Sequence, residues 1–294
     1  MPAIQWYPGH MAKTTRILKE NIKHIDVVIE VMDARIPSSS ENPDFHKLVA
    51  GRRRLVLLNK EDLADPSVSL LWKEHFAKSN VKVIFSNLKT GGGLKTVKDV
   101  LKKIGEDKIA RHASKGVVHR PVRAMVVGIP NSGKSTLINQ LAGRASTKTA
   151  DRPGVTRSKQ WVRIGGGIDL LDTPGILWPK FENQQVALNL AFTGAIKDAI
   201  TDVVEVADTL LQWINENYPD CLANRYKLSD DILLHGSLLG AVAKRRSFLL
   251  PGGEVDMNRA ATIVLDEFRA AKIGRISLES PPPEEGATAQ MDEQ

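Results

Sequence analysis

Short apolar runs alternate with stretches of helical periodicity through the first 180 residues. A continuous apolar run predicts a strand buried on both faces, and alternation of such strands with helices predicts a mostly parallel sheet. We expect strands at residues 25–32, 55–58, 81–85, 124–127, 161–164 and 168–171, the last two forming a hairpin about residues 165–167. Helices are predicted at residues 13–22, 66–78, 94–111 and 136–141. The pattern predicts an α/β fold with its ligand site at the carboxyl ends of the strands.

Beyond residue 180 the apolar positions keep a helical spacing and no strand pattern persists. Helices are predicted at residues 186–199, 203–217, 231–248 and 258–272. The proline-rich, acidic stretch from Ser280 onward is typical of a disordered tail. We therefore expect an α/β domain at residues 1–180, a smaller all-α C-terminal domain at residues 181–278 and a disordered acidic tail at residues 279–294.

The charge of the chain is uneven. Residues 1–181 hold 31 basic and 16 acidic residues, a net charge of +15, whereas residues 182–278 carry a net charge of −3 and residues 279–294 hold five acids and no bases. A basic segment of this kind favours nucleic acid as a partner, although a solvated basic face also explains such an excess.

Other features of the composition narrow the class of protein. The single cysteine, Cys221, allows neither an internal disulfide nor a cysteine-based zinc site. No apolar run approaches the roughly 18 residues of a membrane span, and the first residues lack the build of a signal peptide. We therefore expect a soluble cytoplasmic protein, a monomer, with no membrane partner.

The strongest motif lies in the middle of the chain, where residues 128–135 read Gly-Ile-Pro-Asn-Ser-Gly-Lys-Ser. This fits G-x-x-x-x-G-K-[ST] between a predicted strand and a predicted helix, the context of a phosphate-binding loop. Its backbone N–H groups would cradle a phosphate, Lys134 would reach the β- and γ-phosphates, and the Ser135 hydroxyl would ligate Mg²⁺. The expected nucleotide contacts are Asn131, Ser132, Gly133, Lys134, Ser135 and Thr136.

A second motif, Asp172-Thr173-Pro174-Gly175, begins 44 residues after the start of the loop. An aspartate at a strand end can hold Mg²⁺ through water, and the N–H of Gly175 can bind a γ-phosphate that leaves on hydrolysis. Thr156, in a polar segment between the two motifs, is the candidate second hydroxyl ligand of Mg²⁺.

A third motif, residues 59–62 (Asn-Lys-Glu-Asp), selects the base. The Asp62 carboxylate can accept two N–H bonds from guanine, where adenine offers no such pair, and the Lys60 stem can cover the ring. Asn59 belongs to the same motif. Ser86 and Asn87 begin the loop that would back the base.

These motifs are the set of a P-loop GTP-binding domain, but the base motif precedes the phosphate loop. The domain is therefore predicted to be circularly permuted, which preserves the site because each motif stays at the carboxyl end of its strand. The loop after Gly175 then leads directly into the helical domain. We hypothesise that nucleotide state reorients that domain.

The chain resembles the ribosome biogenesis GTPase A (YlqF-like) family of circularly permuted GTPases. The resemblance covers nearly all of residues 3–275 and rests, beyond the three motifs above, on residues 6–13 (Trp-Tyr-Pro-Gly-His-Met-Ala-Lys) and 33–37 (Asp-Ala-Arg-Ile-Pro). It implies GTP hydrolysis with Mg²⁺, stimulated by the large ribosomal subunit during its late assembly. It also implies a helical C-terminal domain that helps contact ribosomal RNA.

The resemblance also implies roles for two residues. Ile176 stands where many GTPases keep a glutamine that orients water, and His10 is the substitute that the family suggests, although a structural role for His10 explains its motif equally well. Asn131 matches the asparagine that helps bind K⁺ in potassium-activated relatives, and a cation there would stabilise charge near the leaving phosphate.

Some points stay open. Ser86-Asn87-Leu88 replaces the more usual Ser-Ala-Lys, which leaves only a backbone role for the loop behind the base.

Residues 244–246 (Lys-Arg-Arg) could contact RNA or form an ordinary helix surface. We expect residues 52–54 and 115–123 to carry much of the phosphate contact. The alternative function is a guanine-nucleotide-dependent RNA-binding module with negligible hydrolysis, whereas Asp62 disfavours an ATPase.

Overall fold

The computed structural model describes residues 16, 18–49, 51–78, 81–113, 121–143, 160–175, 177, 181 and 183–283. At its centre is a six-stranded sheet in the order β3-β2-β1-β4-β6-β5. The strands are β1 (Val27–Asp33), β2 (Arg53–Asn59), β3 (Lys82–Ser86), β4 (Val122–Val127), β5 (Gln160–Ile164) and β6 (Ile168–Asp172). Neighbouring strands are parallel except β5 and β6, which are antiparallel. The mostly parallel sheet and its terminal hairpin are thus confirmed.

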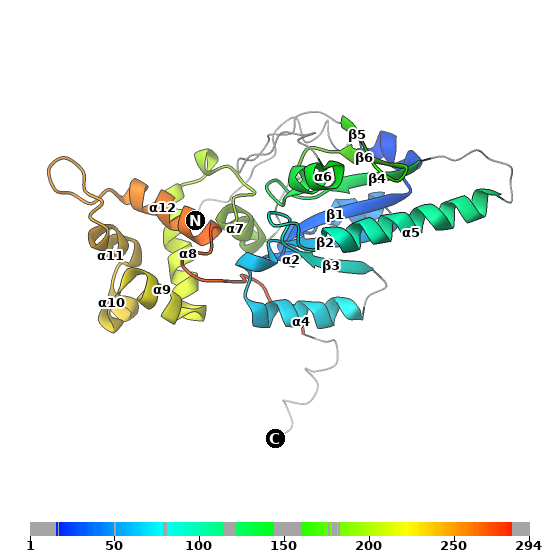
Figure 1. Cartoon of the computed structure of the whole chain (residues 1–294). Helices are drawn as coiled ribbons and strands as arrows, with labels where there is room; N and C mark the ends of the chain where they lie inside the picture. The colour runs from blue at the N-terminus through cyan, green and yellow to red at the C-terminus, as the bar shows by residue number, and fades with distance from the viewer. Residues whose placement is uncertain are drawn as a thin grey trace, which may run out of the picture.

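Helices cover both faces of the sheet. Successive residues of a strand point to opposite faces, so nearly every residue of a central strand is buried. On one face Val27, Ile29 and Val31 pack with residues of α5 (Leu94–Ala113) and α6 (Lys134–Ala142). On the other face Val28 packs with α3 (Pro43–Leu48), and Met32 packs toward α4 (Pro66–Ala77). The sandwich of helices around the sheet is visible in Figure 1. This layering explains why the strands are continuous apolar runs.

The chain after the sheet is helical. Its elements are α7 (Gln184–Phe192), the 3-10 turn η3 (Asp198–Ile200), α8 (Val203–Asn217), α9 (Pro219–Tyr226), α10 (Asp230–His235), α11 (Leu238–Arg245) and α12 (Met257–Arg269). Most of their buried apolar residues form one core, which also contains Ile36 and Ile129 from two loops of the sheet region. Figure 1 shows these helices gathered beside the sheet. The predicted α-helical C-terminal region is confirmed, and its core continues into the sheet region.

Two predicted helices are wrong in extent. The helix expected at residues 231–248 is two helices, because Ser237 starts a new one by accepting a hydrogen bond at its Oγ from the Gly240 N–H (3.3 Å). The helix expected at residues 186–199 ends at Phe192, where the N–H of Ala195 turns back to donate to Leu190 O (2.8 Å). The short helices α9, α3 and α2 (Pro37–Ser40), each of which begins at a proline, were not predicted.

The acidic tail was expected from residue 279, yet Glu279 is held against the protein. Its carboxylate accepts hydrogen bonds from the Ser39 N–H (3.0 Å) and from Asn189 Nδ2 (3.0 Å). Tertiary contacts therefore order the chain beyond α12. Local composition does not predict such contacts. Within the part of the chain that the structure describes, no helix is long and apolar enough to cross a membrane.

Candidate functional site

Strand register brings the sequence motifs to one edge of the sheet. Asp33, Asn59 and Ser86 lie opposite one another at the ends of β1, β2 and β3. On the other side of β1, β4 leads into the phosphate loop, and Asp172 ends β6 opposite Val126. The three motifs, separated by up to 110 residues along the chain, thus meet at the carboxyl ends of parallel strands.

The phosphate loop has the backbone geometry that its motif predicts. Gly133 takes a φ of +107°, and a Cβ there would lie 2.3 Å from Asn59 Nδ2, so only glycine fits. The next residue, Lys134, begins α6, whose first turn contains the half-buried Ser135 and Thr136. The N–H groups of this turn have no partner within the helix and make its N-terminus suited to an anion.

Two opposite charges are buried beneath the loop. Lys134 is only 6% exposed, and its Nζ donates to Ile129 O (2.7 Å). Burial lowers the pKa of Lys134 to about 8, against the attraction of Asp172. Asp172 is 1% exposed, and burial raises its pKa to about 6, although the charge of Lys134 opposes the shift. Burial disfavours the charged form of both side chains. A ligand of opposite charge bound beside either of them would stabilise that charged form.

The same place holds buried polar atoms that lack a hydrogen-bond partner. They are both carboxylate oxygens of Asp172 and the Oγ of Ser132. Buried polar groups are nearly always satisfied, so atoms left unpaired together mark a site for a ligand. Carboxylate and hydroxyl oxygens suit Mg²⁺, and the N–H groups with Lys134 suit phosphate oxygens. The residues therefore fit a nucleotide phosphate with its Mg²⁺.

Gly175 lies directly against the phosphate loop. A Cβ on Gly175 would stand 2.7 Å from Pro130 Cα, so its backbone can approach the loop only because it has no side chain. The preceding strand end is fixed by Thr173, whose Oγ1 donates to Val126 O (2.7 Å). The structure thus brings Gly175 beside the place expected for the terminal phosphate.

At the base end Asn59 acts as a bridge inside the protein. Its Nδ2 donates to Ser132 O (2.8 Å), and its Oδ1 accepts from the Leu88 N–H (3.0 Å). Both ends of the amide are therefore engaged, joining the base motif to the phosphate loop and to the loop after β3. Asn87 shapes that last loop by accepting at its Oδ1 from the Lys89 N–H (3.1 Å), while Ser86 lies buried at the end of β3.

Lys60 and Asp62 stand at the open side of this edge. Asp62 is exposed in the single 3-10 turn η2 (Glu61–Leu63), where its carboxylate can receive a base. Lys60 takes a left-handed φ of +64°, uncommon for a residue with a side chain, and its Nζ pairs with Asp33 Oδ2 (2.9 Å).

The sequence reasoning missed the roles of Asp33 and Arg35. Arg35 is fully buried and binds Asp33 with two hydrogen bonds, 3.0 Å from Nε to Oδ1 and 2.8 Å from Nη2 to Oδ2. Burial alone would raise the pKa of Asp33, but Arg35 and Lys60 outweigh it and hold that pKa far below its usual range. The available signal was a charged Asp-x-Arg directly after a buried strand.

Three predicted site residues, His10, Thr156 and Ile176, lie outside the described residues, and so do residues 115–120 of the basic segment expected to contact phosphate. Asn131 is described, and its Nδ2 donates to Gly194 O (2.8 Å) in the helical region. The phosphate loop is therefore linked to the helical region through the side chain expected to help bind K⁺.

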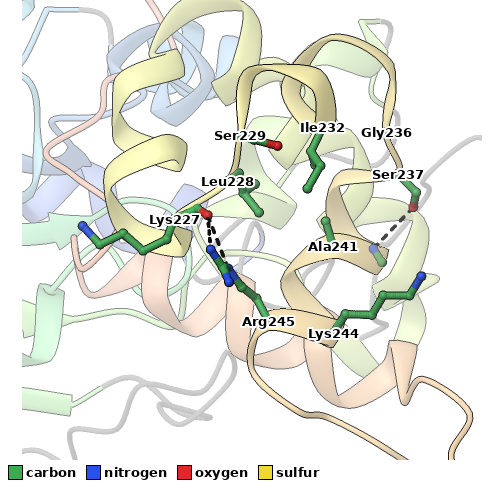
Figure 2. Close-up of a pocket in the computed structure, with 10 residues that line it drawn as sticks. Lys227, Leu228, Ser229, Ile232, Gly236, Ser237, Ala241, Lys244 and Arg245 are labelled. Atoms are coloured by element: carbon green, nitrogen blue, oxygen red, sulfur yellow. Dashed lines mark hydrogen bonds between the residues drawn. The ribbon is translucent and has the colours of Figure 1, made fainter.

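A cavity of about 590 Å³ lies elsewhere, lined by α10, α11 and the residues that join α9 to α10. Figure 2 shows Arg245 at its edge, donating to Lys227 O from Nη2 (2.9 Å). Arg246 stands over the Tyr226 ring, 5.7 Å from its centroid. Two of the three bases at residues 244–246 thus stabilise the helical fold, which favours the structural interpretation of that cluster. None of the predicted nucleotide contacts among the described residues lines this cavity.

Known proteins resemble this chain over nearly its whole length. The family described as "50S ribosome-binding GTPase" matches residues 123–229. The chain is 45% identical over 278 residues to Ribosome biogenesis GTPase A of Bacillus licheniformis, covering 95% of this chain and 98% of the relative. The protein of that name from Thermotoga maritima is 31% identical over 280 residues, 95% of either chain.

A solved structure agrees with these relatives. The crystal structure of GNP-bound YlqF from T. maritima matches with a TM-score of 0.62 at 27% identity, over 92% of this chain and 98% of that one. Similarity of sequence and fold extends across both the sheet and the helical region. The chain therefore belongs to the ribosome biogenesis GTPase A family, and it is a GTPase.

Proposed function

We propose that this GTPase acts in the late assembly of the large ribosomal subunit, and that the subunit stimulates its turnover. The observation that carries the catalytic part is the set of unpaired, buried oxygens of Asp172 and Ser132 beside the buried Lys134. The names of the relatives support the ribosomal part. We expect a cytoplasmic monomer with an α/β domain to residue 180 and an RNA-contacting helical domain at residues 181–278.

The phosphates of GTP are held by Lys134 and by the N–H groups of residues 131–136. Ser135 and Thr156 would ligate Mg²⁺, and Asp172 would help to hold it. When bound, Mg²⁺ neutralises the charge that develops on the phosphates. The N–H of Gly175 binds the γ-phosphate and is released when that phosphate leaves.

The base is selected by Asp62, which accepts from guanine N1 and N2, while Lys60 covers the ring. Asn59 acts through the loops that it joins. Ser86 and Asn87 shape the backbone behind the base. Asn131 takes part in a K⁺ site near the leaving phosphate.

The attacking water is oriented by His10. Ile176, after Gly175, carries no group that could hold water by hydrogen bonding.

The helical region is proposed to respond to the nucleotide. The loop after Gly175 leads into it, and Asn131 donates to Gly194 O across the same junction. Loss of the γ-phosphate would therefore change contacts on both sides of the phosphate loop. Small-angle scattering with GDP and with a non-hydrolysable GTP analogue tests this, and identical profiles with identical hydrogen-exchange protection would remove the proposal.

Ribosomal RNA is proposed to meet the basic surface of residues 1–181. Each of the three arginines at 52–54 already has a partner in the protein: Arg52 donates to Ile25 O, Arg53 forms an exposed pair with Asp107, and the partly buried Arg54 pairs with Glu30. Exposed lysines of α5 are better placed. Lys95, Lys98 and Lys102 follow a helical spacing that puts them on one face. Phosphate contact is thus expected along α5.

Co-sedimentation with purified large subunits across a salt series tests the partner. For Lys95→Glu/Lys98→Glu/Lys102→Glu, the slope of log affinity against log salt should fall by roughly 0.9 per lost phosphate contact. The matched variant with arginine at the three positions keeps the charge and should bind as the parent does. Binding that ignores salt, or that is equal for small subunits, would contradict the proposal.

A further inference from the structure

After α12 the chain does not leave the molecule but returns to the sheet. Figure 1 shows the segment running from α12 toward α2 and α4. We call residues 275–279 the strap. It reaches the two loops that follow β1 and β2, which carry the residues around the guanine motif.

The first contacts of the strap are with the loop that contains Asp62. Arg275 donates from Nε to Ala64 O (2.8 Å) and from Nη2 to Glu61 O (2.8 Å). The next N–H of the strap, that of Ile276, donates to Leu63 O (3.3 Å). Three carbonyls on either side of Asp62 thus accept hydrogen bonds from two consecutive strap residues.

The same loop is held at its far end, at Asp65. The N–H of Asp65 donates to Ser277 Oγ (3.1 Å). Tyr218, which joins α8 and α9, donates its hydroxyl proton to Asp65 Oδ2 (3.0 Å). Asp65 in turn caps α4 by accepting from the Ser67 N–H (2.8 Å), so the start of α4 and the end of the base loop are fixed together.

The strap also holds the loop after β1, through which Lys60 is positioned. The Leu278 N–H donates to Arg35 O (2.9 Å). The Arg35 guanidinium lies 5.3 Å from the centre of the Phe268 ring of α12 and binds Asp33, which pairs with Lys60. Lys60 and Asp62, the two residues of the motif that are assigned to the base, are therefore each connected to the C-terminal segment, one through each loop.

The base loop has little structure of its own to hold its shape. It consists of Lys60 in a left-handed conformation followed by the single turn η2. A turn this short leaves its last carbonyls without partners in the helix, and a left-handed non-glycine residue persists only when its surroundings hold it. The strap supplies partners for the Leu63 and Ala64 carbonyls and a second donor to the Glu61 carbonyl, so the presentation of Asp62 depends on residues more than 200 positions later.

We propose that the strap is a positioning element for guanine recognition, with Arg275 as its main positioning residue. The helical region thereby helps set guanine selectivity although it contributes no atom to the base. This inference rests on the proposed assignment of Asp62 to guanine N1 and N2.

Binding of GDP and IDP to the full-length protein tests the proposal. Hypoxanthine keeps N1–H but lacks the 2-amino group, so the ratio of the two affinities reports how well Asp62 is placed. In Arg275→Ala, GDP binding should weaken by about tenfold more than IDP binding, about 1.4 kcal/mol. A role confined to stability would weaken both nucleotides equally and leave the ratio unchanged, which would overturn the proposal.

A matched control is Arg245→Ala. Arg245 also donates from Nε and Nη2 to a backbone carbonyl, that of Lys227, but inside the helical region. Its removal should leave the GDP-to-IDP ratio at the parent value. An equal fall in the ratio for both variants would contradict a specific action of the strap. If Arg275→Ala does not fold, Ser277→Ala and Tyr218→Phe, which each remove one hydrogen bond to Asp65, take its place in the same assay.

Asp62→Asn in the same assay separates the two levels of inference. Its side-chain amide should exchange the preference for GDP for one for XDP, whose base carries an oxygen at position 2. If the exchange fails, the base assignment is wrong, and the strap proposal goes with it. If the exchange occurs while Arg275→Ala keeps the parent ratio, the strap proposal alone is wrong.

Discussion

The two ends of the nucleotide site are built on opposite principles. At the phosphate end Asp172 and Ser132 hold unpaired buried oxygens, and burial shifts the pKa of both Lys134 and Asp172 toward their neutral forms. At the base end the side chains of the motif are paired, Lys60 with Asp33 and Asn59 with Ser132 and Leu88, and the one buried atom without a partner among the described residues there is Nη1 of Arg35. An unpaired buried polar group costs folding about 1–3 kcal/mol, which a ligand can recover. The phosphate end thus stores binding energy, whereas the base end is preorganised.

Removal of Lys134 should have the largest effect, because it empties the phosphate end of its buried cation. In Lys134→Ala we expect kcat/KM for GTP to fall by about 10³-fold, the order found when one charged transition-state contact is lost. Steady-state GTP hydrolysis measures this. Lys82→Ala is the control, since Lys82 is exposed at the start of β3, the opposite edge of the sheet. If Lys134→Ala kept a tenth of the parent activity, the phosphate end would not depend on this buried cation, and its contrast with the base end would be wrong.

The contact between Gly133 and Asn59 joins the two ends of the site. A substitution there should have the next largest effect, on the free energy of unfolding. A methyl group at Gly133 would meet Asn59 Nδ2 at 2.3 Å and break its bond to Ser132 O. Gly133→Ala should therefore lower the free energy of unfolding by about 3 kcal/mol through strain and a lost buried hydrogen bond. Gly143→Ala, also at positive φ but with nothing within 4 Å, should cost only about 1 kcal/mol. Urea denaturation compares them, and equal losses would mean that Asn59 does not join the ends rigidly.

A third predicted effect is a pH dependence in the nucleotide-free protein. Folding raises the pKa of Asp172 from 3.8 to about 6, so the folded state binds its proton more tightly. The free energy of unfolding should therefore fall as pH rises from about 4 to 6. The lowered pKa of Lys134 acts only above about pH 8, and that of Asp33 only below about pH 4.

Denaturation across pH 4 to 6 should show a shallower fall for Asp172→Asn than for the parent. The difference between the two curves isolates Asp172 from other acids, such as Glu279, whose pKa burial also raises. Parallel curves would show that folding does not raise the pKa of Asp172, which would contradict the account of the phosphate end.

The sequence predicted the parts of the fold that depend on local pattern. The strands ending at Asn59, Val127 and Asp172 are continuous apolar runs, and the glycine-rich loop carries its own conformational requirement. The site was predictable because parallel strands bring their carboxyl ends together. Asp65, which caps α4, is a residue type that favours the position before a helix.

What escaped prediction depends on contacts distant along the chain. Arg35 looks like any charged residue after a strand, and only the packing of Phe268 over it shows that it is buried. Arg275 gains its partners from the loop after β2 and Glu279 gains one of its partners from α2, both more than 200 residues earlier. No periodicity or propensity encodes such pairs, so the strap was assigned partly to a tail.

GTP hydrolysis with and without purified large ribosomal subunits, each in K⁺ and in Na⁺ buffer, tests the central claim most directly. The phosphate end contains buried polar atoms without partners, and we propose that a partner activates the enzyme. The protein alone should therefore hydrolyse GTP slowly. We predict strong stimulation by large subunits, greater in K⁺ than in Na⁺, and none by small subunits. Turnover that large subunits leave unchanged in both salts would contradict the account.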